Sequence, residues 1–142
     1  MPRRIVLDTN VIVSGLRSRS GASFRVLSLV GTGAFEHCLS VPLLFEYEDA
    51  LKRPGAVPIR RGAIEEILDY LCSAADRRRI YFLWRPQLPD SGDDLVLEVA
   101  VAGRCDTIVT FNQRDFVGSD RFGVRIQTPA AFLVSLQREG IK

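Results

Sequence analysis

The stretch IVLDTN at residues 5–10 places three apolar residues directly before a carboxylate. A short apolar run of this kind is typical of a buried strand, so we place Asp8 at the carboxyl end of a strand at residues 4–8. A carboxylate buried there without a partner costs several kcal/mol, so Asp8 needs a compensating group. The branched residues at 11–13 fit either a strand or a helix, which leaves the next element open.

The rest of the chain alternates between helix-like and strand-like segments. Apolar residues at helical spacing, with caps and stop signals, predict helices at residues 23–30, 41–53, 63–75, 93–102 and from 129 onward. Short apolar runs predict strands at residues 35–39, 80–84, 107–110 and 124–127. The alternation predicts an α/β fold, a three-layer sandwich with a central, mainly parallel sheet. Ligands of such sheets bind beyond the carboxyl ends of the strands, where Asp8 and Asp115 both lie in this assignment.

The composition is that of one globular domain. The 142 residues are 46% hydrophobic and 25% charged, and we expect a single domain over residues 1–142. Cys38, Cys72 and Cys105 are far apart and form no C-x-x-C pair, so we expect reduced core thiols rather than disulfides or a zinc site. There is no signal-peptide core and no membrane-spanning run, which predicts a cytoplasmic protein with no membrane-embedded part.

The arginines are clustered although the net charge is only +2. Such clusters can neutralise phosphates locally, and each cluster taken alone is also compatible with a solvated helix face or end. The candidates for contact with a phosphate backbone are Arg17, Arg19, Arg77, Arg78 and Arg79.

Four acids stand at positions of interest, two after strands and two on helices: Asp8, Asp115, Asp94 and Glu46. Taken alone, Asp94 is explained as a helix cap, Glu46 as part of a solvated helix face and Asp115 as a turn residue. Two carboxylates about 4 Å apart repel by about 4 kcal/mol at an effective dielectric of about 20, so four in one pocket require a cation. Oxygen ligands without His or Cys select a hard ion, which predicts Mg²⁺ or Mn²⁺. Phosphodiester hydrolysis is the reaction expected of such a site, because the metal activates water and stabilises charge on the phosphate.

Two motifs resemble the PIN-domain family: VLDTNV at residues 6–11 and TFNQRDF at residues 110–116. The order and spacing of the four acids also match the family along nearly the whole chain. The chain is similar in particular to the PIN toxins of bacterial toxin–antitoxin modules, the VapC type. The resemblance implies a metal-dependent ribonuclease. It assigns the acidic quartet to Asp8, Glu46, Asp94 and Asp115, and the supporting positions to Thr9, Asn10, Asp93, Thr110 and Asn112.

The chain departs from the family pattern before Asp94. Relatives often carry an acid-Pro-acid run there, whereas this chain has DSGDD at residues 90–94. Asp93 is therefore a second candidate for the ligand position, and the distance along the chain to Thr110 favours Asp94. The resemblance also implies an RNA substrate, a homodimer, and a small antitoxin protein whose segment covers the acidic cleft.

The alternative is a PIN fold without measurable catalysis that acts as an RNA-binding or protein-interaction module. The presence of all four acids argues against it. Three other side chains are expected to be structural. His37, the only histidine, lies in a predicted strand. Trp84 and Phe111 are expected in the core or in a cleft wall rather than as platforms for stacking bases.

Overall fold

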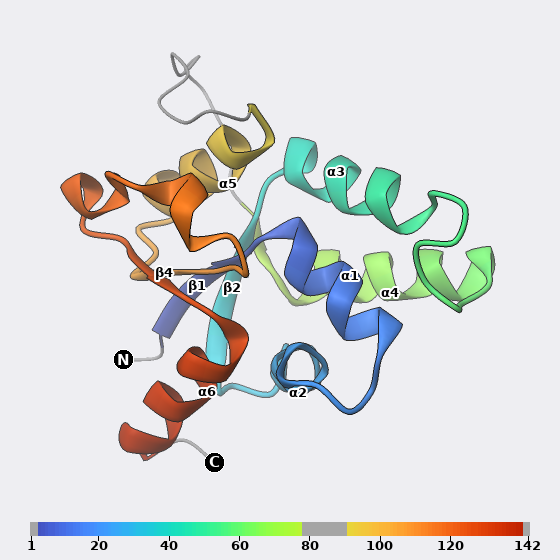
Figure 1. Ribbon diagram of the computed structural model, residues 1–142, viewed down its shortest axis with the longest axis horizontal. Helices are drawn as coiled ribbons and strands as arrows, with labels where there is room; N and C mark the ends of the chain where they lie inside the picture. The colour runs from blue at the N-terminus through green and yellow to red at the C-terminus, as the bar shows by residue number, and fades with distance from the viewer. Residues whose placement is uncertain (1–2, 78–90, 141–142) are drawn as a thin grey trace.

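The computed structural model describes residues 3–77 and 91–140, in which strands and helices alternate along the chain (Figure 1). The strands are β1 (Arg3–Leu7), β2 (Phe35–Leu39), β3 (Asp76–Arg77), β4 (Thr107–Val109) and β5 (Arg125–Gln127). The helices are α1 (Thr9–Arg17), α2 (Ala22–Leu29), α3 (Val41–Leu51), α4 (Arg61–Ala74), α5 (Ser91–Ala102) and α6 (Pro129–Arg138). Two 3₁₀ turns, η1 (Gln113–Phe116) and η2 (Ser119–Phe122), join β4 to β5.

Within the described residues, the strands form a five-stranded sheet in the order β3-β2-β1-β4-β5, and each neighbouring pair is parallel. β1 is central, because Ile5 pairs with His37 of β2 on one side and with Thr107 of β4 on the other. The chain builds outward from β1 to β3 and then returns to β4 on the opposite side of β1. A reversal of this kind opens a crevice beyond the carboxyl ends of the strands, and Asp8 follows β1 at that point.

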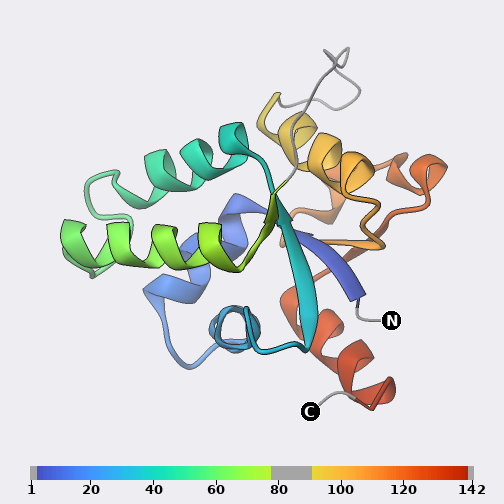
Figure 2. The ribbon, with the colours of Figure 1, turned by 180° about the vertical axis from the view of Figure 1, so that it is seen from behind.

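Helices cover both faces of the sheet. Helix α5 packs against β1, β2 and β4, whereas α1 packs against α2 and α2 against α6. Figures 1 and 2 show α5 on one side of the strands, with α2 and α6 on the other. The structure therefore confirms the expected α/β sandwich around a parallel sheet.

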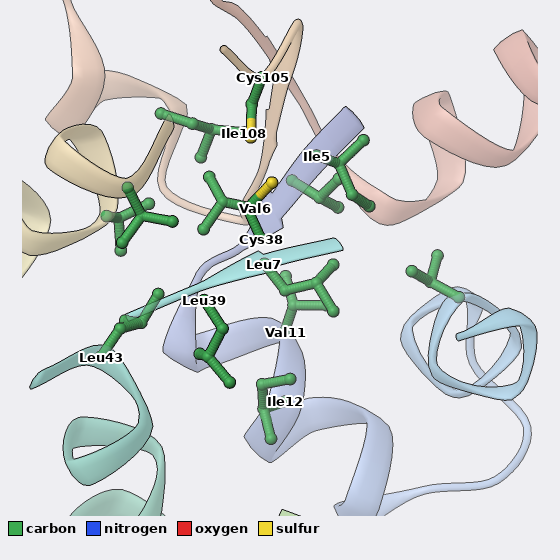
Figure 3. Packing of buried hydrophobic residues seen from close by; sticks show 14 of the residues in the cluster. Ile5, Val6, Leu7, Val11, Ile12, Cys38, Leu39, Leu43, Cys105 and Ile108 are labelled. Atoms are coloured by element: carbon green, nitrogen blue, oxygen red, sulfur yellow. The ribbon is translucent and has the colours of Figure 1, made fainter. Parts of the chain in front are cut away.

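The core is built around β1. Its residues Ile5, Val6 and Leu7 are fully buried, as expected of a central strand that is covered on both faces. Val11 and Ile12 of α1 pack beside them, together with side chains of β2 and α3 (Figure 3). Residues 11–13, which the sequence left open between strand and helix, are helical because α1 buries these two side chains against the sheet.

Hydroxyl caps fix the starts of two helices. Ser40 Oγ accepts a hydrogen bond of 3.2 Å from Leu43 N at the start of α3, and Thr128 Oγ1 accepts one of 3.2 Å from Ala131 N at the start of α6. A proline stands in the first turn of each helix, where its missing N–H has no helical partner to lose. Both helix starts confirm the sequence prediction.

Several element boundaries differ from the prediction. Helix α3 ends at Leu51, two residues early, and residues 111–116 contain the turn η1 rather than a plain loop. Strand β3 is a two-residue element that pairs with Cys38 and Leu39 of β2, and no local sequence pattern predicts it. The strand expected at residues 80–84, which contains Trp84, lies outside the described residues.

Two arginines secure the amino end of β1 instead of facing solvent as a basic patch. Arg3 is only 6% exposed. Its Nε donates to Asp106 at 2.8 Å and its Nη1 to Glu139 at 3.0 Å. Arg4 Nη2 donates to Asp76 at 2.6 Å. These ion pairs lie at the opposite end of β1 from the crevice, so neither arginine serves it.

Among the described residues, the cysteines form no disulfide. Cys38 and Cys105 are buried side by side in the core (Figure 3), as expected, whereas Cys72 is partly exposed. The contact with Cys38 and burial raise the pKa of the Cys105 thiol, which keeps it protonated and unreactive. No helix in the part of the chain that is described has both the length and the apolar character that crossing a membrane requires.

Candidate active site

Asp8 occupies the junction between β1 and α1. Its backbone N–H donates to Val109 O of β4 at 3.0 Å, which continues the sheet pairing by one residue. Its φ of −68° and ψ of 151° are those of a helix N-cap, and Oδ1 accepts a 2.8 Å hydrogen bond from Thr9 N. The residue is only 7% exposed. The end of the central strand and the start of a helix together fix the position of this carboxylate.

Thr110 holds the other oxygen of the same carboxylate. Its fully buried hydroxyl donates to Asp8 Oδ2 at 2.6 Å and accepts from Asn112 N at 2.9 Å. Asn10 Nδ2 lies 3.4 Å from the same hydroxyl, and Asn10 Oδ1 accepts from Phe111 N at 3.4 Å. The turn after β4 is therefore tied to the first turn of α1. The resemblance implied that Thr110, Asn112 and Asn10 support the acids, and the structure brings them into contact with Asp8 or with one another.

Glu46 reaches the same cleft from α3. Asp8 and Glu46 both line one cavity of about 520 Å³, which also takes residues from α1, from the turn after β4 and from the chain just beyond α3. Its lining is Asp8, Thr9, Asn10, Val13, Ser14, Arg17, Glu46, Ala50, Arg53 and Asn112. Two acids separated by 38 positions in the sequence thus meet because α3 starts directly after β2, the neighbour of β1.

The cleft has an acidic part, formed by Asp8 and Glu46, and a basic part, formed by Arg17 and Arg53. Tyr47 is fully buried beneath it, and its hydroxyl donates to Leu7 O. Burial, and after it the charges of Asp8 and Glu46, raise the pKa of Tyr47 well above its usual value. The phenol therefore stays neutral and adds no further negative charge below the cleft.

The remaining two acids of the quartet are placed differently. Asp115 lies in η1, half-buried, and its N–H donates to Asn112 O at 3.0 Å, but Asp115 does not line the 520 Å³ cavity. Asp93 and Asp94 lie in the first turn of α5, and their side chains lie outside the described part of the structure. Helix α5 packs against β1, α3 and η1, which carry or precede the other three acids of the quartet. Among the described residues, no group of three or more His, Cys, Asp or Glu side chains is placed so that it could hold a metal ion.

The donor set of the cavity nevertheless fits a hard cation. It offers carboxylate oxygens from Asp8 and Glu46 and an amide from Asn112. Thr9 Oγ1 is buried there and makes no hydrogen bond to any described group. Oxygen donors of this kind match the preference of Mg²⁺ or Mn²⁺, and no sulfur or imidazole group accompanies them in the lining.

The basic residues divide between the cleft and the rest of the surface. Arg17 lines the cavity, whereas Arg19 is exposed beyond the end of α1. Of the predicted cluster at 77–79, Arg77 lies in β3 with an undescribed side chain, and Arg78 and Arg79 lie outside the described residues. Arg53 also lines the cavity, and it was not among the candidates predicted from the sequence. Its spacing of seven residues from Glu46, two helical turns, was the available signal.

The two described side chains that were expected to be structural differ in outcome. His37 is buried, and its Nε2 lies 2.9 Å from Leu71 O of α4, which agrees with a structural role. Phe111 is 48% exposed, so a place in the core is wrong for it. It stands in the turn after β4, between Thr110, whose hydroxyl bonds to Asp8, and Asn112, whose N–H bonds to Thr110.

Comparison with known proteins agrees with this architecture. No curated protein matches the chain. Among solved structures, VapBC2 from Rickettsia felis bound to a DNA fragment from its promoter contains a similar chain, with a TM-score of 0.56 and 17% sequence identity. The match covers 88% of this chain and 98% of that one, and at this identity it concerns the fold. A family model described as the PIN domain matches residues 4–114, most of the chain, and the protein therefore belongs to the PIN domain family.

Proposed function

We propose that this chain is a divalent-metal-dependent endoribonuclease that hydrolyses RNA phosphodiester bonds. PIN domains are generally nucleases that use divalent metals, and the chain belongs to that family. The observation that carries the proposal is the setting of Asp8. Its carboxylate is buried at the end of the central strand, held by Thr9 N and Thr110 Oγ1, and shares one cavity with Glu46.

The proposed ligands are Asp8, Glu46, Asp94 and Asp115, with Mg²⁺ or Mn²⁺ as the ion. Two carboxylates that line one cavity repel each other, and a divalent ion offsets that repulsion. The packing of α5 against β1, α3 and η1 supports the inclusion of Asp94 and Asp115. Asp93, next to Asp94 in the same helical turn, is the alternative ligand from α5.

The residues around Asp8 fix the orientation of its carboxylate. When bound, the ion activates a water molecule and stabilises the charge that develops on the phosphate. Asp8 cannot turn away from this position, because one oxygen is held by a backbone N–H and the other by a buried hydroxyl. The negative charge of Asp8 is therefore fixed in position before the substrate binds.

The test is a nuclease assay on single-stranded RNA with Mg²⁺ or Mn²⁺. We expect cleavage by the wild type, and loss of cleavage in chelator, in Asp8→Asn and in Asp94→Asn. Asp69→Asn is the matched control, since it removes the same charge at an exposed position of α4. Equal cleavage by the wild type and both site variants would assign the activity to another site or to a contaminant. RNA binding without any cleavage would favour the non-catalytic binding module.

We further propose that the chain is the toxin of a toxin–antitoxin pair, acts in the cytoplasm and forms a homodimer. The support is the fold shared with a chain of the VapBC2 structure. The expected partner is a small protein encoded by a neighbouring reading frame, which would suppress both cleavage and growth arrest when expressed with this chain. Growth that is unaffected by expression of the active nuclease would refute the toxin role. A monomeric mass in solution light scattering would refute the homodimer.

A further inference from the structure

The cleft that holds Asp8 runs between two neighbouring helices. Helices α1 and α3 pack against each other and start beyond the carboxyl ends of adjacent strands (Figure 1). On α1, the lining residues are Thr9, Asn10, Val13, Ser14 and Arg17, and the last four share one helical face. On the other side, the lining residues Glu46, Ala50 and Arg53 are spaced by four and three positions. The cavity is therefore a passage between two facing helical stripes.

The charges along this passage are ordered. Asp8 lies at the strand end, before α1, and Glu46 lies midway along α3. Both arginines lie at the far end, Arg17 in the last turn of α1 and Arg53 just beyond α3. From Asp8 to Arg17 the helix rises by about 13 Å. The small side chains of Ser14 and Ala50 line the space between the two ends.

The guanidinium groups of Arg17 and Arg53 can donate hydrogen bonds to an anion. Arg17 Nε donates to Ala56 O at 3.1 Å, which steadies the group and uses one of its five N–H donors. Arg53 pairs with Asp49 at 2.8 Å, but the two side chains are 67% and 71% exposed. A surface pair of this kind contributes little, so Arg53 can exchange Asp49 for a phosphate.

We propose that Arg17 and Arg53 form a subsite for a substrate phosphate adjacent to the one that is cut. The inference rests on the proposed nuclease function and deepens it. Asp8 and Glu46 repel a phosphate backbone, so the passage needs cations to admit it, and guanidinium groups bind phosphate with charge-assisted hydrogen bonds.

Binding of a fluorescent single-stranded RNA in chelator tests the subsite without cleavage. The double variant Arg17→Gln/Arg53→Gln should bind about tenfold more weakly, near the lower end for loss of charge-assisted hydrogen bonds. The slope of log affinity against log salt should fall by about 0.7 for each phosphate that the variant no longer neutralises. Arg25→Gln/Arg138→Gln is the matched control, because it removes the same charge from exposed residues of α2 and α6 that do not line the cavity. Equal weakening in both double variants would reduce the effect to net charge and overturn the subsite.

A second measurement locates the phosphate. Each phosphate near the cleavage position is replaced in turn by an uncharged methylphosphonate. In the wild type one such position should raise KM with kcat unchanged, and in the Arg17/Arg53 double variant the same replacement should have no effect. Replacement of both arginines by lysine should restore part of the affinity. A penalty that persists in the glutamine variant would overturn the assignment.

The outcomes separate this inference from the proposed function. If the wild type binds RNA through these arginines and does not cleave it, the nuclease proposal fails and the subsite stands. If the wild type cleaves RNA and the glutamine variant binds it as tightly as the wild type, the subsite fails alone. If the wild type neither binds nor cleaves RNA, both are refuted.

Discussion

Thr110 offers a direct test of how the site is held, because its hydroxyl makes the buried hydrogen bond to Asp8 Oδ2 at 2.6 Å. We consider Thr110→Val, which keeps the shape of the side chain and removes the hydroxyl. The change also removes the acceptor for Asn112 N at 2.9 Å. Asn112 itself is exposed, so water can replace that second bond at low cost.

The magnitude follows from the two effects. A hydrogen bond to a charged group contributes about 1.5–3 kcal/mol, and the added buried methyl group returns about 0.8 kcal/mol. The free energy of unfolding should therefore fall by about 1–2 kcal/mol. At about 3 °C per kcal/mol for a chain of this size, Tm falls by roughly 3–6 °C. Because Thr110 positions a proposed metal ligand, affinity for Mn²⁺ should fall by about 10- to 100-fold.

Thermal denaturation in chelator and Mn²⁺ titration measure the two quantities separately. Thr32→Val is the matched control, since the hydroxyl of Thr32 bonds to Leu29 O at an exposed turn. Its effect should stay within about 0.5 kcal/mol. Thr110→Ser retains the hydroxyl and should keep most of the metal affinity. If Thr110→Val changes neither Tm nor Mn²⁺ affinity, the hydroxyl does not hold Asp8, and the proposed support of this site is wrong.

Three further variants test other parts of the structure. In chelator, Asp8→Asn should raise Tm, because asparagine caps a helix as well as aspartate does and the repulsion between residue 8 and Glu46 disappears. An unchanged or lower Tm would contradict repulsion between Asp8 and Glu46. Arg3→Met should lower the free energy of unfolding by about 2–3 kcal/mol, since it breaks the ion pairs of a buried arginine with two partly exposed acids at the far end of β1. Cleavage per folded molecule should be unchanged, and a specific loss of activity would contradict the placement of Arg3. Burial lowers the pKa of His37 despite its bond to Leu71 O, so the folded state binds this proton less readily than the unfolded state. Stability should therefore fall as pH drops below about 6.5, and His37→Gln should remove that dependence in urea titrations; an unchanged profile in the variant would refute the assignment.

The sequence predicted those parts of the fold that local patterns determine. The apolar run of β1, the starts of α3 and α6, and the position of Asp8 after a strand each depend on a few neighbouring residues. Strand β3 could not be predicted, because Asp76 and Arg77 form a strand only by pairing with β2. The ion pairing of Arg3 also depends on tertiary contacts, because its partner Asp106 lies 103 positions further along the chain.

In the candidate site, too, some features follow from local motifs and others only from tertiary contacts. The motif residues Asp8 and Thr110 identified it, and their contact follows from the pairing of β1 with β4. Arg53 was missed because it belongs to no arginine cluster and becomes relevant only where α3 faces α1. Asp115 lies in the η1 turn and does not line the cavity with Asp8, and a motif does not encode this placement.

A Mn²⁺ titration followed by electron paramagnetic resonance is the decisive experiment for the metal site, because it counts bound ions independently of any substrate or activity. We predict that the wild type binds Mn²⁺, that Asp8→Asn loses this binding, and that Asp69→Asn retains it. Equal Mn²⁺ affinity in the wild type and in Asp8→Asn would contradict the claim that the carboxylate at the end of β1 anchors a metal.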